Sequence, residues 1–521
     1  MIKKRHWWLS AGSMIAAASP IAVVASCAFV ESFFQKDQED AKKAGFGIWD
    51  NQSLDFASAS FWNRPEVIKA TGDQFNIWKD LALKGQSAKA TMQTEVQFLD
   101  MGQADATLIK VLPQSDLKPS EMVANSFNIL IDSGDFKTGT NEKDQKIHTP
   151  FYKDKLKPTL QDALNSADKI DLFMFSHAHG DHIGQAAQVI NDFAKQGQSI
   201  VINWGDIDQN SSGFRKMIAT IIKKQLVYLD PFVENAIDIN RIAMDANLSD
   251  PKKSEIFSQF VNPKDPNSKV YGSFNDPNKV DSWVANGNKL FKMSPSANII
   301  NFAPDNFFAY LAPQSDYEPK KLNKSENENS INAMFKLSNQ SGSYRMIFTG
   351  DAEGHTHEDM LDAINTNSRF QDSDPDHKLS VDLYKVAHHG STTEASNNRS
   401  FLTSILKPTT KFIIQTNDNK LFSGSPTLKA QFFENLIVAA NANNYQNIAN
   451  LVYITQNLGD IIFKFDNSQD LQKPQISFID RNEQIKQDRL LLKPNQVTTN
   501  LASKYQTGTK FEHLIVKKQS N

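Results

Sequence analysis

The feature that most limits the fold of this 521-residue chain is a cluster of metal-binding side chains behind an apolar run. Residues 170–175, IDLFMF, read as a strand buried on both faces. His177, His179, Asp181 and His182 follow at once, and a turn at Gly180 can bring the last two round to face the first two. Three imidazoles and a carboxylate suit Zn²⁺, Mn²⁺ or Fe²⁺ better than Ca²⁺ or Mg²⁺, which prefer oxygen ligands. The segment therefore predicts a metal site at a strand end.

Two further motifs also stand behind strand-like runs. Asp351 closes the sequence TGD after YRMIF, and a carboxylate there could bridge two cations, because each oxygen can bind one. His388 and His389 lie in AHHGS after LYKV, where one can complete a second metal site and the other can face a substrate. Each motif is a weak signal alone, but the three together predict one site built from several strand ends.

Strand-like and helix-like segments alternate along most of the chain. Strands are expected within residues 94–112, 125–134, 199–204, 306–313, 331–338, 411–417 and 451–465, and helices within 185–197 and 427–441. Residues 205–295, rich in Asn, Asp, Lys and Pro, are long for a connection and are interpreted as a partly helical insertion near the site. The pattern predicts an α/β fold.

These motifs resemble the metallo-β-lactamase superfamily, in which HxHxDH, an Asp after a strand and a later His occur in this order. The similarity is greatest to the soluble domain of ComEC-type DNA-uptake competence proteins, through FLDMGQADATLI (98–109), NILIDSG (128–134) and ENSINAMFKL (328–337). The resemblance covers residues 94–466, without the membrane channel of those proteins. It implies a four-layer αββα sandwich over 93–466, interrupted by the insertion at about 205–295.

The resemblance also implies two divalent metal ions, Zn²⁺ or Mn²⁺, that hold a bridging hydroxide as nucleophile. It assigns His177, His179 and Asp351 to one ion, and Asp181, His182, Asp351 and one of His388 or His389 to the other. His389 is preferred as the ligand, so that His388, with Ser391, faces the phosphate oxygens; Asp181 is counted as catalytic as well. Asp100, Asp105 and Asp132 are expected behind the ligands, with Asp132 holding a ligand imidazole through its second nitrogen.

The chain departs from the pattern of the competence proteins at two positions. Ala104 replaces a usual Gly, which would tighten a turn, and Ser425 stands where a His is expected, which puts one outer substrate contact in doubt. His355 and His357, at i and i+2 of an expected helix, do not share a face, and we interpret them as supporting or surface residues.

The two ends of the chain differ from the part between them. Residues 1–26 have a basic start, an apolar stretch and small residues before Cys27, as in a bacterial lipoprotein signal peptide with Cys27 as the lipidated residue; a plain membrane anchor is the alternative. Residues 27–92 read as a helical or linker region. The extension 467–521 is basic, with nine basic and four acidic residues from position 471 onward; it is either a solvated tail or a surface that attracts polyanions.

The predicted function is a metal-dependent hydrolase tethered to the outer face of the cell membrane, a phosphodiesterase or nuclease with nucleic acid as its substrate. A phosphocholine or other small-molecule esterase, and a DNA-binding surface receptor with little turnover, remain alternatives. Without residues 1–26, which hold three of the 56 basic and none of the 59 acidic residues, the net charge is −6, which excludes a uniformly basic nucleic-acid binder. The oligomeric state is left open.

Overall fold

The computed structural model describes residues 91–479 apart from 115–125, 135–138, 141–145, 148–151, 165–168, 197, 204–211, 225, 230–297, 304, 312–326, 373, 417–427 and 446–450. The predicted signal peptide, Cys27, the region 27–90, Ser425, most of the predicted insertion and the chain beyond Ile479 lie outside these residues. None of the described helices is long and apolar enough to span a membrane.

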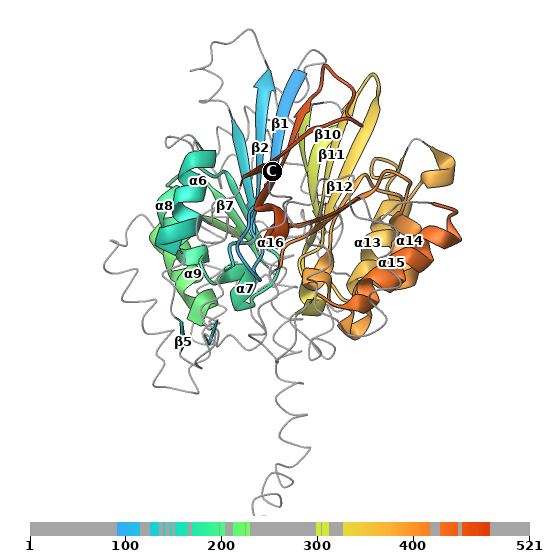
Figure 1. The fold of residues 1–521 in the computed structure, drawn as a ribbon. Coiled ribbons are helices and arrows are strands. Elements are labelled where there is room, and N and C mark those ends of the chain that lie inside the picture. The colour runs from blue at the N-terminus through green and yellow to red at the C-terminus, as the bar shows by residue number, and fades with distance from the viewer. Residues whose placement is uncertain are drawn as a thin grey trace, which may run out of the picture.

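Two sheets face each other in the middle of the molecule (Figure 1). The first sheet runs in the order β17 (Gln475–Ile479), β16 (Asp460–Asp466), β1 (Thr91–Phe98), β2 (Thr107–Gln114), β3 (Phe127–Ile131), β6 (Leu172–Phe175), β7 (Ile200–Asn203) and β8 (Val227–Leu229). Neighbouring strands are parallel from β3 to β8 and antiparallel from β17 to β3.

The second sheet is built in the same way. Its order is β15 (Val452–Ile454), β14 (Lys411–Ile414), β13 (Leu383–Lys385), β12 (Gly342–Phe348), β11 (Asn332–Asn339), β10 (Asn306–Leu311) and β9 (Asn298–Ala303). The strands are parallel from β12 to β15 and antiparallel from β9 to β12. A short pair, β4 (Gly139–Thr140) and β5 (Lys146–Ile147), stands apart from both sheets.

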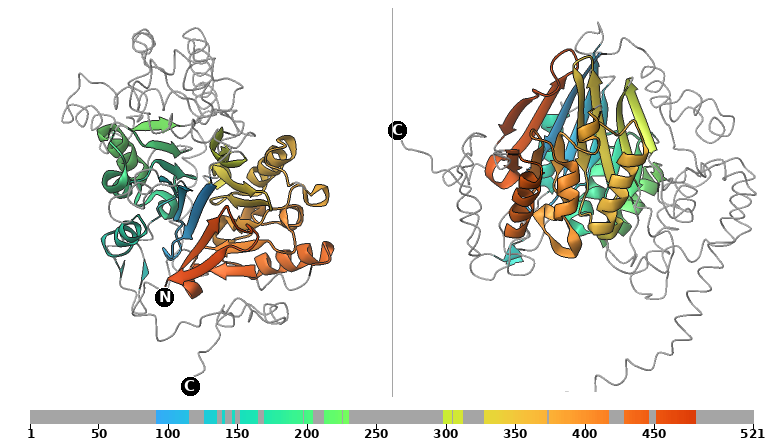
Figure 2. Two further views of the ribbon diagram at one scale, coloured as in Figure 1. Left: turned by 90° about the horizontal axis from the view of Figure 1, so that it is seen from above. Right: turned by 90° about the vertical axis from the view of Figure 1, so that its right-hand side faces the viewer.

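Helices cover the outer face of each sheet (Figures 1 and 2). The first sheet is accompanied by η2 (Tyr152–Leu156), α6 (Lys157–Ala163), α7 (Gly180–Ile183), α8 (Ala186–Phe193) and α9 (Ser212–Lys223). The second half of the chain contributes η3 (Asn327–Asn329), α13 (Gly354–Thr366), η4 (Pro375–His377), η5 (Ala387–Gly390), η6 (Thr393–Ala395), α14 (Arg399–Ile405), α15 (Ala430–Ala442) and α16 (Thr455–Leu458).

The layers follow from the alternation of apolar side chains along buried strands. In β6, Leu172 and Met174 belong to the core between the two sheets, whereas Phe173 and Phe175 belong to the core under the helices. Phe98 of the first sheet stacks on Phe348 of the second, with ring centroids 6.0 Å apart. A third core lies between the second sheet and α13–α15. The predicted αββα sandwich is therefore confirmed.

The structure describes two segments at the edges of the predicted domain. Within the predicted insertion, α9 and β8 continue the regular pattern, since β8 pairs with β7 as the edge of the first sheet. Beyond residue 466, β17 pairs with β16 and so extends the same sheet into the predicted basic extension. The other predicted domain boundaries stay predictions.

Candidate metal centre

The predicted site residues follow the carboxyl ends of the parallel strands in both sheets. Asp132 follows β3, His177 to His182 follow β6, Asp351 follows β12, and His388 and His389 follow β13. Parallel strands end at one edge of a sheet, so the facing sheets bring these segments together. The topology thus brings the sequence motifs together, although His182 and Asp351 lie 169 positions apart in the sequence.

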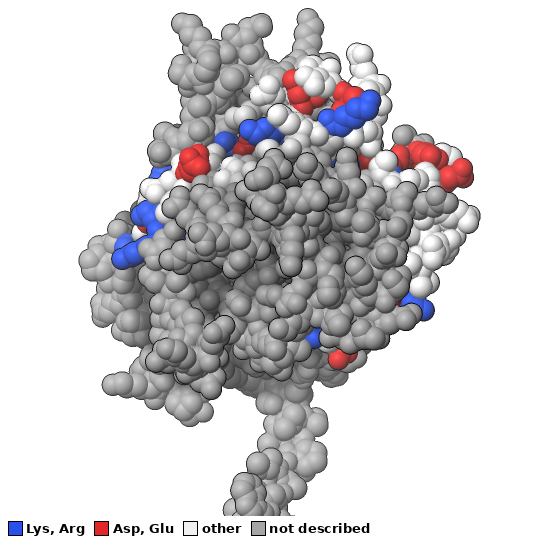
Figure 3. Space-filling view, in the orientation of Figure 1, with Lys and Arg blue, Asp and Glu red and all other residues white. Residues whose placement is uncertain are grey.

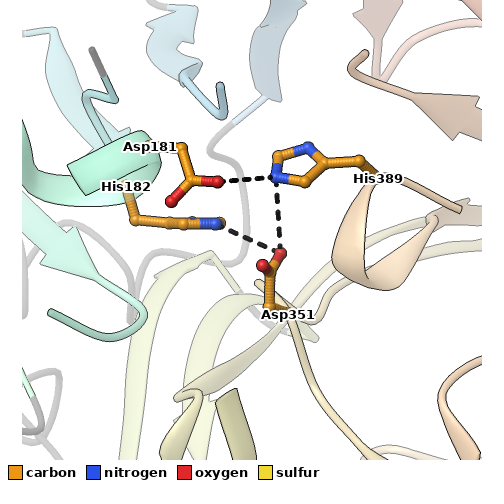
Figure 4. Close-up of side chains that lie close together, drawn as sticks. All are labelled: Asp181, His182, Asp351 and His389. Carbon is orange, nitrogen blue, oxygen red and sulfur yellow. Dashed lines mark ion pairs between the residues drawn. The ribbon is translucent and has the colours of Figure 1, made fainter. Parts of the chain in front are cut away.

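Four side chains converge at this edge: Asp181, His182, Asp351 and His389 (Figure 4). Their nearest ligand atoms all lie within 4.8 Å of one another. His182 Nε2 is 3.1 Å from Asp351 Oδ1, and His389 Nε2 is 3.8 Å from the same oxygen and 3.4 Å from Asp181 Oδ2. Asp181 and His182 come from α7, while the other two come from the second half of the chain.

The Nδ1 atoms of His182 and His389, which point away from the cluster, each have a hydrogen-bond partner. His182 Nδ1 lies 2.8 Å from Asp132 Oδ2, and His389 Nδ1 lies 2.8 Å from the backbone carbonyl oxygen of Gln415. A carbonyl oxygen only accepts, so His389 Nδ1 carries a proton and donates it. The carboxyl oxygens of Asp132, which accept from Ser176, favour the same arrangement at His182, although burial raises the pKa of Asp132. Any lone pair of either ring is therefore on Nε2, which faces the carboxylates, as in metal-binding histidines.

Three buried atoms at the centre of this cluster have no partner in hydrogen-bond geometry in the described part of the chain, although the first and third lie within ion-pair distance: His182 Nε2, His389 Nε2 and Asp351 Oδ1. Buried polar atoms are normally hydrogen-bonded, and each exception needs an explanation. Two imidazole nitrogens and carboxylate oxygens form a ligand set that suits Zn²⁺ or Mn²⁺. The residues present thus fit a divalent metal ion.

The charges of the cluster stabilise one another. Burial alone would raise the pKa of Asp351, but the neighbouring imidazoles of His182 and His389 hold it well below its usual range. Burial alone would lower the pKa of His389, but Asp351 and Asp105 outweigh it and raise the pKa to about 10. The same balance, with Asp351 and Asp132 as partners, raises the pKa of His182 well above its usual value. Without a metal, protons on the two Nε2 atoms thus take the place of a cation.

His177 and His179 lie beside this cluster. His177 Nε2 is 4.0 Å from Asp351 Oδ2 and 3.0 Å from Nδ1 of the exposed His179. Burial, together with the positive charge of His182, lowers the pKa of His177 well below its usual value, so this ring is neutral. Among the described residues, His177, His179 and Asp351 do not form a group of ligand atoms as tight as the first. The structure therefore brings together one of the two expected ligand sets and places the other set's members next to it.

His388 and Ser391 belong to the same loop but differ in burial. His388 is half-buried, with Nε2 3.8 Å from Asp351 Oδ2, and burial lowers the pKa of its ring despite the charge of Asp351. Ser391 is buried, and its hydroxyl is 3.0 Å from that of Thr393. His389 is the deeper of the two histidines and is the one in the four-residue cluster, whereas His388 lies nearer to solvent.

The three aspartates expected behind the ligands have different partners. Asp132 accepts from the backbone N–H and the hydroxyl of Ser176, at 2.7 and 2.9 Å, in addition to its contact with His182. Asp105 forms a buried ion pair with Lys385 and lies 3.4 Å from His389 Nδ1. Asp100 pairs with Lys155 at 3.3 Å. Asp132 and Asp105 thus adjoin ligand imidazoles, and the role of Asp100 stays a prediction.

Glycine is required at position 134, where the segment NILIDSG meets the segment that carries Asp181 and His182. A Cβ at Gly134 would lie 1.6 Å from the carbonyl oxygen of Asp181 and 2.7 Å from the Cβ of Ala104. The backbone of residues 133 and 134 is hydrogen-bonded here to the carbonyl oxygens of His182 and Asp105, at 2.7 and 2.9 Å. Gly134 therefore allows the close approach of the segment that carries Asp181 and His182.

Several residues that support the site carry no signal in the sequence motifs. The Ser330 hydroxyl accepts from the backbone N–H of Asp351 at 3.1 Å and lies 3.3 Å from His177 Nδ1. The Gln415 side chain donates to the carbonyl oxygens of Leu99 and Ala106, at 3.1 and 2.8 Å, and so joins the two sheets beneath His389. Lys385, which pairs with Asp105, stands two residues before AHHGS and is the one supporting residue close to a motif.

The interpretation of His357 was wrong. This residue is buried in α13, where its ring stacks on Phe401 at 3.9 Å, and neither ring nitrogen has a hydrogen-bond partner among the described residues. Burial lowers the pKa of His357 to about 3, so it is a neutral core side chain that neither supports the ligands nor lies at the surface. His355, on another face of the helix, is exposed.

No family model matches the sequence, and the comparison with curated proteins finds no relative. Among solved structures, Rm3 metallo-beta-lactamase is found at 11% sequence identity and a TM-score of 0.22, over 70% of this chain and 96% of that chain. The fold assignment rests on strand order and layers. These layers, with the His/Asp cluster at the strand ends, support the resemblance to the metallo-β-lactamase superfamily.

Proposed function

We propose that this protein is a metal-dependent hydrolase that cleaves phosphodiesters and acts on DNA or RNA. The observation that carries the metal-dependent part is the cluster of Asp181, His182, Asp351 and His389, in which two Nε2 atoms and one carboxylate oxygen are buried without hydrogen bonds. Such atoms are costly to bury unless something binds them. A divalent cation is the ligand that nitrogen and carboxylate donors in this arrangement fit best.

We propose two ions, Zn²⁺ or Mn²⁺. The four-residue cluster would hold one, and His177, His179 and Asp351 would hold the other. Bound ions supply a Lewis acid that polarises a phosphoryl oxygen and makes water reactive at neutral pH. The position of His177 Nε2 supports the second site. It lies 4.0 Å from Asp351 Oδ2, whereas the first cluster uses Asp351 Oδ1.

The chain's own residues orient the substrate in this proposal. The lowered pKa of His388 keeps its imidazole neutral at pH 7, so one ring nitrogen bears a proton and donates it to a non-bridging phosphate oxygen. Ser391 supports the same loop, where its hydroxyl can donate to a second oxygen. In the metal-free site the buried imidazoles lower the pKa of Asp181 and Asp351 against the effect of burial, so both carboxylates are ionised and available as ligands.

The preference for nucleic acid comes from the resemblance to competence proteins and from the basic segment after residue 471. In the face shown in Figure 3, the described Lys and Arg side chains lie among Asp and Glu rather than in a patch of one sign. We assign the attraction for a polyanion to the C-terminal extension, because basic residues outnumber acidic ones there nine to four. We also propose that Cys27 is lipidated and tethers the protein to the outer face of the cell membrane, because its upstream sequence has the layout of a lipoprotein signal.

The test uses the chain from residue 28 onward, stripped of metal and reloaded with Zn²⁺ or Mn²⁺. DNA, RNA and bis-p-nitrophenyl phosphate are incubated in parallel with the wild type, with Asp351→Ala, and with Asp362→Ala as a control on the exposed side of α13. Cleavage of nucleic acid that is lost in Asp351→Ala and with chelator, but kept in Asp362→Ala, is the expected result.

Two other results would change the proposal. Turnover of the small ester alone would replace the nuclease with a small-molecule phosphodiesterase. Salt-dependent binding of DNA without turnover of any substrate would replace the enzyme with a receptor.

A further inference from the structure

The loop that carries His388 and His389 has an unusual backbone. His388 (φ 50°), His389 (φ 52°) and Gly390 (φ 85°) are consecutive residues in the left-handed region, and Glu394, Ala395 and Asn397 adopt it as well. Residues other than glycine disfavour this region because the side chain approaches the backbone. Two adjacent histidines keep it only where surrounding contacts over-determine the conformation.

One buried amide supplies such contacts at both ends of the turn. The side chain of Asn397 donates to the carbonyl oxygen of Ala387 at 2.9 Å and to that of Ser391 at 2.7 Å. These two carbonyls flank the left-handed segment, so the amide fixes the span between them. Asn397 is fully buried, and water does not compete for these hydrogen bonds.

A tyrosine completes the arrangement from the strand below. The Tyr384 hydroxyl donates to Asn397 Oδ1 at 2.6 Å and accepts from the backbone N–H of Ala387 at 3.0 Å. Tyr384 lies in β13 and is fully buried. The amide is thus anchored to the sheet that sets the position of the whole loop.

The loop is also tied to the segment that carries Asp351. The backbone N–H of His388 donates to the Gly350 carbonyl at 3.1 Å, and the Ser396 hydroxyl donates to the Ala352 carbonyl at 2.7 Å. A shift of the loop would therefore change the distance between His389 and Asp351. A cation bound by both residues requires this distance to stay fixed.

We propose that Asn397 and Tyr384 are positioning residues that hold His388 and His389 in the geometry needed for metal and substrate. This inference rests on the proposed metal-dependent function. Neither side chain touches the ligand atoms; both act through the backbone of residues 387–391. Supporting hydrogen bonds behind metal ligands are commonly worth 10- to 100-fold in metal affinity, and we expect a loss of that order without them.

The test is a titration of the metal-free protein with Co²⁺, followed by the visible absorption of the bound ion, which reports the ligands around it. Asn397→Gly removes the amide but tolerates the positive φ of residue 397, and Tyr384→Phe removes one hydroxyl. The control is the neighbouring Asn398→Ala, which removes the cap of α14, where Asn398 Oδ1 accepts from Phe401 N at 2.9 Å. Thermal unfolding of each metal-free variant is measured in parallel.

We expect Asn397→Gly and Tyr384→Phe to bind Co²⁺ about 10- to 100-fold more weakly, with an altered spectrum. Asn398→Ala should unfold at a lower temperature but bind Co²⁺ like the wild type, which separates positioning from stability. If Asn397→Gly does not fold, Tyr384→Phe decides. Wild-type affinity and spectrum in the folded variants would overturn this inference alone, whereas failure of the wild type to bind Co²⁺ would overturn the proposed function with it.

Discussion

Replacing Gly134 by alanine should damage the metal centre without touching any ligand. The added Cβ would stand 1.6 Å from the carbonyl oxygen of Asp181, where an ordinary contact begins at 3.4 Å. The two backbones would have to separate by 1.8 Å, the difference between these two distances. The atom that the Cβ would meet is a backbone carbonyl oxygen, which accepts from the backbone N–H of Asp105, so no flexible side chain can absorb the change.

This displacement is large compared with what a metal site tolerates. Ligands must stay within about 0.5 Å of their productive positions, and the shift would carry both Asp181 and His182. We therefore expect Gly134→Ala to lose at least 100-fold in affinity for Zn²⁺, about 2.8 kcal/mol, and to lower the free energy of unfolding by about 1–3 kcal/mol through overpacking.

Gly180 offers a matched control. It lies next to Asp181 in the sequence, but a Cβ there would have no heavy atom within 4 Å. Zn²⁺ affinity is measured by competition with a chromophoric chelator for the wild type, Gly134→Ala and Gly180→Ala. Gly180→Ala should bind like the wild type. Wild-type Zn²⁺ affinity in a folded Gly134→Ala variant would show that the backbones at Gly134 and Asp181 do not approach each other this closely.

The further predictions concern three side chains: Asp132, His389 and His357. Asp132→Asn replaces the carboxyl group behind His182 Nδ1 by an amide and should weaken Zn²⁺ binding about 10- to 100-fold in the same competition assay. Because the pKa of His389 is raised to about 10 in the metal-free site, a metal ion must displace its proton on binding. The apparent Co²⁺ affinity should therefore rise between about pH 6.5 and pH 8.5, and an affinity that does not change with pH would contradict this. For the same reason, the contribution of His389 to metal-free stability is complete below pH 6.5 and is lost as the pH rises through about 10. The pKa of His357 is lowered to about 3, so its burial lowers the free energy of unfolding as the pH falls below 6.5. His357→Leu should reduce the loss of unfolding free energy between pH 8 and pH 5 by about 2 kcal/mol, measured by urea unfolding. Its metal affinity should be unchanged.

Much of the fold could be predicted because apolar runs and polar turns alternate regularly. The strand before His177 and the helix at Ala430–Ala442 follow from such patterns, whereas the αββα layers were implied by the resemblance of the motifs to the metallo-β-lactamase superfamily. The edge strands β8 and β17 are short and lie in polar surroundings, so they had no comparable signal in the sequence.

The site could be predicted only where its residues cluster along the chain. Ser330 and Gln415 support the ligands through contacts between strand ends, which local spacing does not contain. Helical spacing shows that His355 and His357 face different sides, but not which side is buried; packing against Phe401 decides that. The left-handed backbone of His388 and His389 likewise depends on Asn397, eight residues beyond the second of them.

The most direct test of the metal centre is an anomalous difference map from crystals of the protein grown with Zn²⁺ and measured at the zinc absorption edge. We expect a peak bounded by His182 Nε2, His389 Nε2 and the carboxylates of Asp181 and Asp351. A map with no peak there, and with direct hydrogen bonds between these side chains, would contradict it.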